Sequence, residues 1–247
     1  MLQEPQTVTQ EDNGVSRLLA TDRFAGSLGL RVYHSLRHAI LTLALRPGEI
    51  LRKPEICEHL GVSRSPVSDA VARLAADGLV DVVPQAGTFV TFLSMSEIRA
   101  GAFIREAIEV ATAVHMATVI TDDQLRQLRR NLVMQEALVA DGDHQGFMQL
   151  DMQMHELLLS FTGFPRLSEV SDTAWLSVHR ARQSLLPFEG RMAAALREHQ
   201  AILAALEAHD PEAARGAVQF HLRQLLKNLA PLEHERPELF SALPERA

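Results

Sequence analysis

The chain has 247 residues, 47% of them apolar, and this length and composition are typical of two folded domains that each bury a core. No apolar run approaches the roughly 18 residues of a membrane-spanning helix, and the start of the chain lacks the basic and apolar stretches of a signal peptide, so the sequence excludes membrane insertion and predicts a cytoplasmic protein. A net charge of −7 argues against a uniformly basic nucleic-acid binder, and the single cysteine, Cys57, excludes an internal disulfide.

The chain begins with a polar segment that precedes two predicted helices. Residues 1–27 are rich in Gln, Thr, Asp and Glu with little apolar periodicity, so we expect a flexible arm over residues 1–22. Four apolar side chains then recur at helical spacing: Val32, Leu36, Ile40 and Leu43. The helix that they predict should end near residues 46–48. A short second helix is predicted from Glu55 to Leu60.

A tight joint between two helices follows. Gly61 supplies the left-handed conformation that ends the short helix, and Ser63 can cap the next helix by accepting a hydrogen bond from a first-turn amide. Pro66 falls within that first turn, where a missing N–H costs nothing. Four side chains then have core-facing spacing: Val67, Ala70, Val71 and Leu74. The pattern predicts a helix-turn-helix unit.

The start of this third helix carries the side chains that point outward. These are Arg64, Ser65 and Ser68, at the end that recognition helices present to base edges in the major groove. Arg64 can donate to O6 and N7 of one guanine, a pairing worth about 1–3 kcal/mol of discrimination, whereas the serines are expected to contact phosphates. We therefore expect sequence-specific binding to duplex DNA.

Two β-rich runs complete the unit. Residues 79–83 and 88–92 are joined through residues 84–87 (PQAG), as expected of a two-stranded wing. The order of helix, helix, helix and hairpin predicts a winged helix-turn-helix domain over residues 23–93. A winged helix used only for protein contacts is the alternative.

Motifs in this region resemble the GntR family of bacterial transcription regulators. The motifs are residues 45–48 (LRPG), 60–67 (LGVSRSPV), Leu74, 78–80 (GLV) and 84–90 (PQAGTFV). The chain departs from the family where Ser68 replaces a second arginine of many members and where Lys53-Pro54 replaces a common Glu-Arg. The expected DNA contacts are Arg64, Ser65, Ser68, Arg52, Lys53, Gln85, Gly87 and Thr88.

The charge of the chain is unevenly divided. Residues 28–92 contain seven Lys/Arg and six acidic residues, so this segment has a net charge of +1 and the remainder −8. Because +1 gives only a weak attraction to phosphates, affinity must come from a few well-placed cations and from two copies acting together. We expect a homodimer on a palindromic operator.

Residues 94–231 contain no convincing strand pattern. Long apolar-periodic segments rich in Ala, Leu, Glu and Arg predict an all-α bundle of about six helices, which makes the whole chain mainly α. Cap and turn signals mark the helix boundaries at residues 94–97, 121–123, 141–143, 163–165, 187–190 and 209–211. Beyond Pro231, we expect residues 232–247 to form a loosely held tail.

Four side chains of the predicted bundle have the chemistry and spacing of metal ligands. Asp151 and His155 lie at i, i+4 and share one helix face. His199 and His221 each lie eleven residues from Asp210, roughly 16 Å along their helices, so an antiparallel hairpin brings them level. Three imidazoles and a carboxylate suit Zn²⁺, Ni²⁺ or Mn²⁺. Hydrogen-bonded core histidines are the alternative, and the spacing alone leaves both readings open.

Residues 151–155 (DMQMH), 198–199 (EH) and 220–222 (FHL) resemble the ligand motifs of the FadR-type branch, whose members carry an FCD effector domain. This resemblance implies that Asp151, His155, His199 and His221 bind a divalent transition metal beside a small organic or sugar acid. Residues 104–109 (IREAIE) resemble the opening-helix motif, in which the arginine often reaches the effector. Arg105 is therefore the candidate carboxylate binder, with a salt bridge to Glu109 as the alternative. Further candidate pocket residues are Arg180, Arg182, Trp175, Met148 and Met152.

These features together predict a ligand-responsive transcription regulator in which effector binding shifts the bundle helices and changes the separation of two DNA-binding heads. One alternative is a metal-dependent hydrolase that uses the same Asp/His set. We expect no enzyme, because Asp210 before Pro211 is placed to cap a helix and no separate general base is evident. A DNA binder with a purely structural metal is the other alternative.

Overall fold

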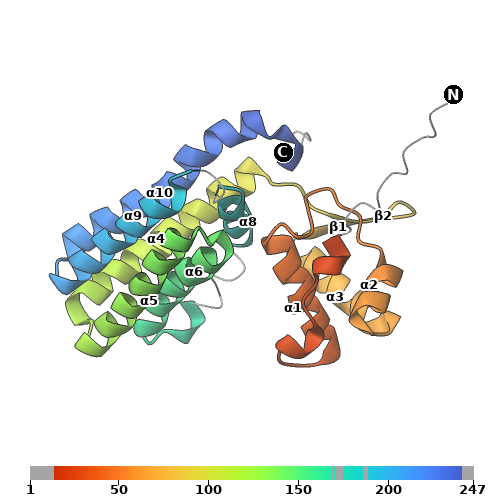
Figure 1. Cartoon of the computed structure of the whole chain (residues 1–247), viewed down its shortest axis with the longest axis horizontal. Helices are drawn as coiled ribbons and strands as arrows, with labels where there is room; N and C mark the ends of the chain where they lie inside the picture. Colours follow the sequence, from red (N-terminus) through yellow and green to blue (C-terminus); the bar gives the residue numbers. More distant parts are fainter. Residues whose placement is uncertain (1–13, 168–169, 171–174, 186–188, 241–247) are drawn as a thin grey trace. The chain divides into compact units, whose positions relative to one another are not determined.

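The computed structural model describes residues 14–167, 170, 175–185 and 189–240. The chain divides into two compact units, Met1–Phe92 and Leu93–Ala247, and the elements of each are labelled in Figure 1. The fold is mainly α with one small sheet, as the sequence predicts. No helix in the described ranges is long and apolar enough to cross a membrane.

The first unit is a winged helix-turn-helix domain, as predicted. Its elements are α1 (Leu28–Leu41), α2 (Lys53–Leu60), α3 (Arg64–Ala76), β1 (Val80–Val83) and β2 (Gly87–Val90). The strands are antiparallel, with Val80 opposite Val90. At the tip of the wing the Ala86 amide donates to the Val83 carbonyl at 3.1 Å, and Gln85 has a φ of 62°. Pro84 followed by a residue of positive φ is the arrangement of a type II turn.

The joint between α2 and α3 differs in one detail from the prediction. Gly61 ends α2 with a φ of 63°, as expected. Ser63 occupies the N-cap position of α3, but its side chain makes no capping hydrogen bond, so that prediction is wrong. A second correction concerns Leu43, which has a φ of 57° and lies beyond the end of α1. The chain turns there because the Leu43 amide bonds to Ile40, which brings Leu45 into the core.

The expectation of a flexible arm over residues 1–22 is wrong for its second half. Residues from 14 onward form two 3-10 turns, η1 (Gly14–Arg17) and η2 (Thr21–Arg23). Val15 and Leu18 are buried, and the Ser35 hydroxyl donates to the Leu19 carbonyl at 2.6 Å. Two apolar anchors in a polar segment give no periodicity to detect. Residues 1–13 of the expected arm lie outside the described residues.

The second unit consists mainly of helices in its described part, as predicted, with one isolated parallel bridge between Leu93 and Phe240. Its helices are α4 (Met95–Val119), α5 (Asp122–Asp141), α6 (His144–Phe161), α8 (Leu176–Leu185), α9 (Arg191–Glu207) and α10 (Pro211–Glu235). Four of the six expected boundary signals supply a side-chain cap: Ser94, Thr121, Asp143 and Asp210 each accept a first-turn amide hydrogen bond. These caps fix where the four helices begin. Residues 187 and 188 of the signal expected at 187–190 lie outside the described residues.

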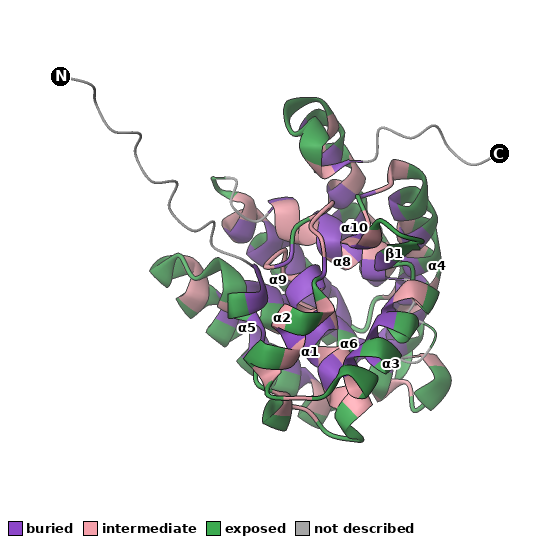
Figure 2. Ribbon diagram, turned by 90° about the vertical axis from the view of Figure 1, so that its right-hand side faces the viewer, coloured by how far each residue is buried: buried purple, intermediate pink, exposed green. Residues whose placement is uncertain are grey.

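Packing between these helices creates the interior in which the polar site lies. Helix α10 packs against α4 and α9, while α5 packs against α6 and α9. Buried residues lie on the faces that the helices turn toward one another, shown in purple in Figure 2. Phe147 and Met116 are fully buried in this core, and Met154 is nearly so.

The expected loose tail over residues 232–247 is wrong as far as Phe240. Helix α10 continues through Pro231 to Glu235, with Leu229 and Leu232 buried on either side of the proline. A 3-10 turn, η3 (Pro237–Leu239), follows, and the Leu93 amide donates to the Leu239 carbonyl at 2.9 Å. Phe240 is buried in the core that this contact closes. Residues 241–247 lie outside the described part of the chain.

Candidate functional site

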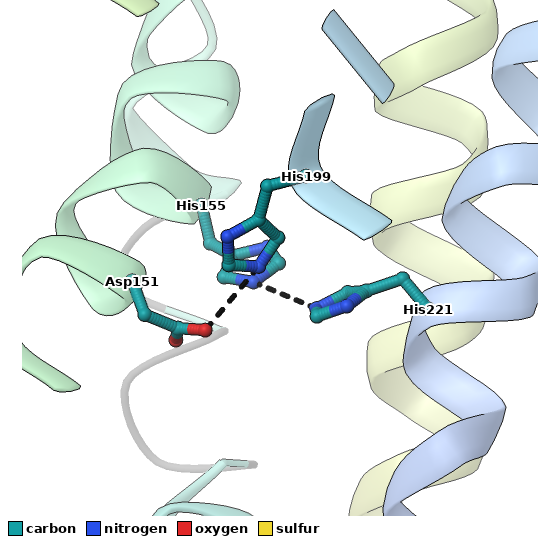
Figure 3. Close-up of side chains that lie close together, drawn as sticks. All are labelled: Asp151, His155, His199 and His221. Atoms are coloured by element: carbon teal, nitrogen blue, oxygen red, sulfur yellow. Dashed lines mark hydrogen bonds and ion pairs between the residues drawn. The ribbon is translucent and has the colours of Figure 1, made fainter. Parts of the chain in front are cut away.

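The four predicted metal ligands meet at one point inside the second unit. Asp151 and His155 come from α6, His199 from α9 and His221 from α10, and their side chains point toward one another (Figure 3). One ligand atom from each lies within 4.8 Å of the ligand atoms of the other three. All four residues are buried, with at most 6% of their surface exposed. The sequence spacing therefore identified a real cluster.

Local structure explains this convergence. Asp210 caps α10 by accepting amide hydrogen bonds from Glu212 and Ala213, both at 3.0 Å, and so sets the turn between α9 and α10. The imidazoles of His199 and His221 lie level across the hairpin, with ring centroids 4.6 Å apart. Asp210 thus has the capping role expected of it.

Each imidazole has an oxygen atom beside its Nδ1. The distances are 2.7 Å for His155 to Glu109 Oε2, 2.7 Å for His221 to Glu198 Oε2 and 2.8 Å for His199 to Gln135 Oε1. A carboxylate can only accept, so it selects the ring tautomer that carries its proton on Nδ1. The Nε2 atom of a neutral ring then has a free lone pair.

The Gln135 amide is oriented by a short relay. Asn131 donates through Nδ2 to the Leu150 carbonyl at 3.0 Å, so its Oδ1 is free to accept from Gln135 Nε2 at 2.7 Å. This arrangement leaves Gln135 Oε1 to accept from His199 Nδ1. All three histidines are thereby held with Nε2 toward the common centre.

The donor set fits a divalent cation. His155 Nε2 and His221 Nε2 lie 3.2 Å apart, and two lone pairs at that distance cannot hydrogen-bond to each other. Among the described residues His199 Nε2 has no hydrogen-bond partner, and it lies 3.3 Å from Asp151 Oδ1. Three imidazole nitrogens and a carboxylate, with an oxygen atom within 2.8 Å of the other nitrogen of each histidine, are a typical ligand set for a transition metal.

The protonation states suit this role. Burial lowers the pKa of His155 and lowers that of His221 well below its usual range, which keeps both rings neutral. Burial alone would raise the pKa of Asp151, but Arg182 and His199 hold it well below its usual range. In the same way Arg105 and His155 outweigh burial and lower the pKa of Glu109 to about 2. The cluster therefore holds neutral His155 and His221 rings beside ionised carboxylates.

Two cavities border the cluster. One, of about 500 Å³, is lined by His155, Met152, Trp175, Arg105 and Arg182 among others. The other has a volume of only about 40 Å³ and is lined by Asp151, His221, Met148, Arg105 and Arg182 among others. Arg105 and Arg182 thus stand at both cavities. Their predicted placement beside the metal ligands agrees with the structure.

The candidate effector residues differ in what they already contact. Arg182 forms an ion pair with Asp151. Arg105 makes the buried salt bridge to Glu109 at 2.5 Å, so the alternative role considered for it is real, and its guanidinium also lies 5.3 Å from the Trp175 ring centroid. Arg180 is buried on α8 but lines neither cavity, and burial lowers its pKa to about 10. The structure does not bring Arg180 to the site.

Sequence reasoning missed the residues that orient the histidines. Glu109 was considered only as a salt-bridge partner of Arg105, Glu198 stands inside a quoted motif without a role, and Gln135 gave no signal. Arg191 was also missed, although it binds both oxygens of Glu198 at 3.0 and 2.9 Å. Its position seven residues before Glu198, two helical turns away, is the one signal that could have revealed this pair.

The predicted DNA-reading residues occupy the start of α3 and its surroundings in the first unit. Arg64, Ser65 and Ser68 are all exposed, consistent with an outward face. Arg52 is exposed and lies 3.5 Å from Glu55, while Lys53 is half-buried.

On the wing, the predicted contacts differ in exposure. Gln85 is exposed at the wing turn and Gly87 is half-buried. Thr88 is 6% exposed, so the structure does not present its side chain for the predicted DNA contact. The reason is strand pairing, because the Thr88 carbonyl accepts from Leu51 at 2.7 Å and the residue faces the core.

Comparisons with known proteins agree with this architecture. Residues 28–90 match the bacterial regulatory proteins of the gntR family, and residues 102–224 match the FCD domain. The HTH-type transcriptional repressor RspR of Escherichia coli K12 is 31% identical over 211 residues, which cover 85% of this chain and 92% of RspR.

Solved structures show the same fold. A putative GntR transcriptional regulator from Rhodococcus sp. RHA1 is 27% identical, with a TM-score of 0.72 over 83% of this chain and 99% of that one. E. coli McbR/YncC has a TM-score of 0.75 at 22% identity, over 84% of this chain and 99% of its own. These relatives are regulators rather than enzymes, which sets the hydrolase alternative aside. The chain therefore belongs to the GntR family of transcription regulators and carries an FCD effector domain.

Proposed function

We propose that this regulator binds a palindromic operator as a homodimer and that a metal-assisted carboxylate site in its helical unit controls DNA affinity. The observation that carries the proposal is the convergence of three histidine Nε2 atoms and the Asp151 carboxylate in a buried site. Histidines serving only as core residues would pair their Nε2 atoms with donors, whereas His155 and His221 turn theirs toward each other.

Asp151, His155, His199 and His221 would hold the ion. Zn²⁺, Ni²⁺ and Mn²⁺ all suit this donor set, and availability as well as geometry decides among them. When bound, the ion supplies a positively charged centre that accepts a carboxylate oxygen of the effector. The chain's own residues keep the histidines oriented and the site closed to bulk water.

The effector would bind in the cavity of about 500 Å³ beside His155. Arg105 and Arg182 supply guanidinium groups at its wall, and guanidinium groups bind carboxylates in bidentate geometry. Small organic and sugar acids are the ligand class with matching charge and size. Neutral metabolites would leave the guanidinium groups without a new partner.

In the first unit, Arg64 would read a guanine and Ser65 and Ser68 would bind phosphates. All three are exposed at the N-terminal end of α3, where a recognition helix enters the major groove. A segment with a net charge of +1 needs two copies for useful affinity, which favours the homodimer.

The experiment that tests the proposal measures operator affinity as metal and acid are added. We expect a change of 5- to 150-fold, which corresponds to a coupling of about 1–3 kcal/mol. If carboxylic acids change neither operator affinity nor thermal stability of the metal-loaded protein, the switching function is wrong.

A purely structural metal is the second candidate. His221→Ala separates the two candidates, because a regulatory site loses its metal while the protein keeps its helical circular-dichroism spectrum and its operator binding. If the His221→Ala variant unfolds under conditions in which the metal-loaded wild type stays folded, the metal has a structural role.

A further inference from the structure

The charges around the candidate metal centre balance before any ion is added. Each buried carboxylate has one guanidinium partner: Asp151 with Arg182, Glu109 with Arg105 and Glu198 with Arg191. The side chains of the three arginines are only 5–17% exposed, so solvent screens these ion pairs weakly. Among the described residues that line the two cavities, Glu156 is the one carboxylate outside these three pairs, and it is exposed to solvent.

A divalent ion in this neutral cluster would leave two positive charges uncompensated. Uncompensated charge in a buried site is unfavourable, because a charge removed from water loses its hydration unless a counter-charge is near. One carboxylate of a bound acid supplies half of the missing negative charge. A second carboxylate supplies the rest.

Two residues that line the larger cavity also carry donors that no residue uses. Arg182 Nη1 and Trp175 Nε1 are buried nitrogen atoms without a hydrogen-bond partner among the described residues, and both residues line the cavity of about 500 Å³. Buried N–H groups are normally paired, and leaving one unpaired destabilises the protein. Two unused donors on residues that line one cavity would serve an oxygen acceptor once their N–H groups turn toward it.

The charge balance and the unused donors together narrow the chemical class of the effector, an inference that rests on the proposed function. The geometry points to a small dicarboxylate, with one carboxylate at the metal and the other accepting from Arg182 Nη1 and Trp175 Nε1. His155 lines the same cavity, so the metal-facing and donor-facing ends belong to one space. Monocarboxylates would bind with one positive charge still uncompensated.

The test uses the full chain loaded with Zn²⁺ and three probes of the same length: succinate, its monoamide succinamate and its diamide succinamide. Their charges differ while their shapes stay alike. By isothermal titration calorimetry we expect succinate to bind at least about tenfold more tightly than succinamate, because it supplies the second counter-charge. Succinamide should not bind. Malonate and glutarate extend the series to shorter and longer dicarboxylates.

The outcomes separate this inference from the proposed function. Equal affinities for succinate and succinamate, or binding of lactate and gluconate but of no dicarboxylate in the series, would overturn the dicarboxylate assignment and leave the regulator with a carboxylate effector. Failure of every acid to bind or to change operator affinity would contradict the proposed function itself.

Trp175→Phe gives an independent check, because it keeps an aromatic ring and removes the N–H donor. Succinate should bind several-fold more weakly to this variant, while the Zn²⁺ content stays at the wild-type value. Arg223→Gln is the matched control, since Arg223 pairs with Glu106 on the exposed surface and lines neither cavity. An unchanged succinate affinity in Trp175→Phe would show that the indole N–H does not contact the ligand.

Discussion

Replacing Arg182 by glutamine should lower the stability of the metal-free protein and raise its affinity for the metal. In the metal-free protein Arg182 is the ion-pair partner of Asp151, whose side chain is 2% exposed. Removing one partner of a buried pair costs about 3–5 kcal/mol, because the other charge is left uncompensated. At roughly 2–4 °C per kcal/mol for a unit of this size, the melting temperature should fall by about 6–20 °C.

With metal bound, the ion takes over the Asp151 charge, and the same substitution should cost much less. By thermodynamic linkage, the difference between the stability lost without metal and the stability lost with metal equals the gain in free energy of metal binding. A difference of about 1.4–3 kcal/mol corresponds to a tenfold to hundredfold gain in Zn²⁺ affinity. Differential scanning fluorimetry with EDTA and with Zn²⁺, and competition against a chromophoric chelator, measure the two quantities.

Arg105→Gln is the matched control for this experiment. Arg105 is more deeply buried than Arg182, at 5% against 12% side-chain exposure, but its partner Glu109 is not a candidate ligand, so its loss should cost nearly the same with and without metal. If Arg182→Gln instead lowers the melting temperature equally in both states and leaves Zn²⁺ affinity unchanged, Arg182 and the metal do not share Asp151, and the reasoning fails.

Three further predictions concern DNA reading, pH and packing. Arg64→Ala should remove about 1–3 kcal/mol of operator discrimination while the melting temperature is unchanged; fluorescence anisotropy that shows full operator affinity would refute the assignment. Burial lowers the pKa of His155 and His221 below the ordinary 6.5, so the unfolded chain binds more protons below that pH, and the metal-free protein should lose stability as the pH falls from 7 to 5. Melting curves in EDTA test this, and an equal loss in His221→Gln would show that His221 contributes nothing to it. Phe147→Ala should destabilise the second unit by about 3–5 kcal/mol in urea unfolding, because Phe147 is fully buried; a loss below about 1 kcal/mol would contradict its role in the core.

Local chemistry made much of the fold predictable. Ser94, Thr121, Asp143 and Asp210 are capping residues whose effect depends on the next few amides only, so they mark helix starts without knowledge of the packing. The level placement of His199 and His221 followed from the same logic, because equal distances from one tight turn need no long-range information.

Features that depend on single contacts could not be predicted in this way. Val15 and Phe240 anchor segments that have no apolar period, and a lone apolar residue in a polar stretch gives no pattern. Ser63 has the right residue type for a cap, but no hydrogen bond forms.

The orienting residues of the metal site illustrate the same limit. Glu109 comes from α4 and Gln135 from α5, and their approach to His155 and His199 depends on how four helices rotate against one another. Sequence spacing within a helix predicts which residues share a face, but it does not predict which face of another helix they meet.

Metal content of the purified full chain tests the central claim most directly. After exposure to Zn²⁺, Ni²⁺ and Mn²⁺ in turn and removal of free ions, native mass spectrometry should show one tightly bound divalent ion per chain for at least one of the three. The Asp151→Asn, His155→Gln double variant should bind none while it keeps its helical circular-dichroism spectrum. A wild-type chain that retains no ion under any of these conditions, or a double variant that retains as much as the wild type, would contradict the account.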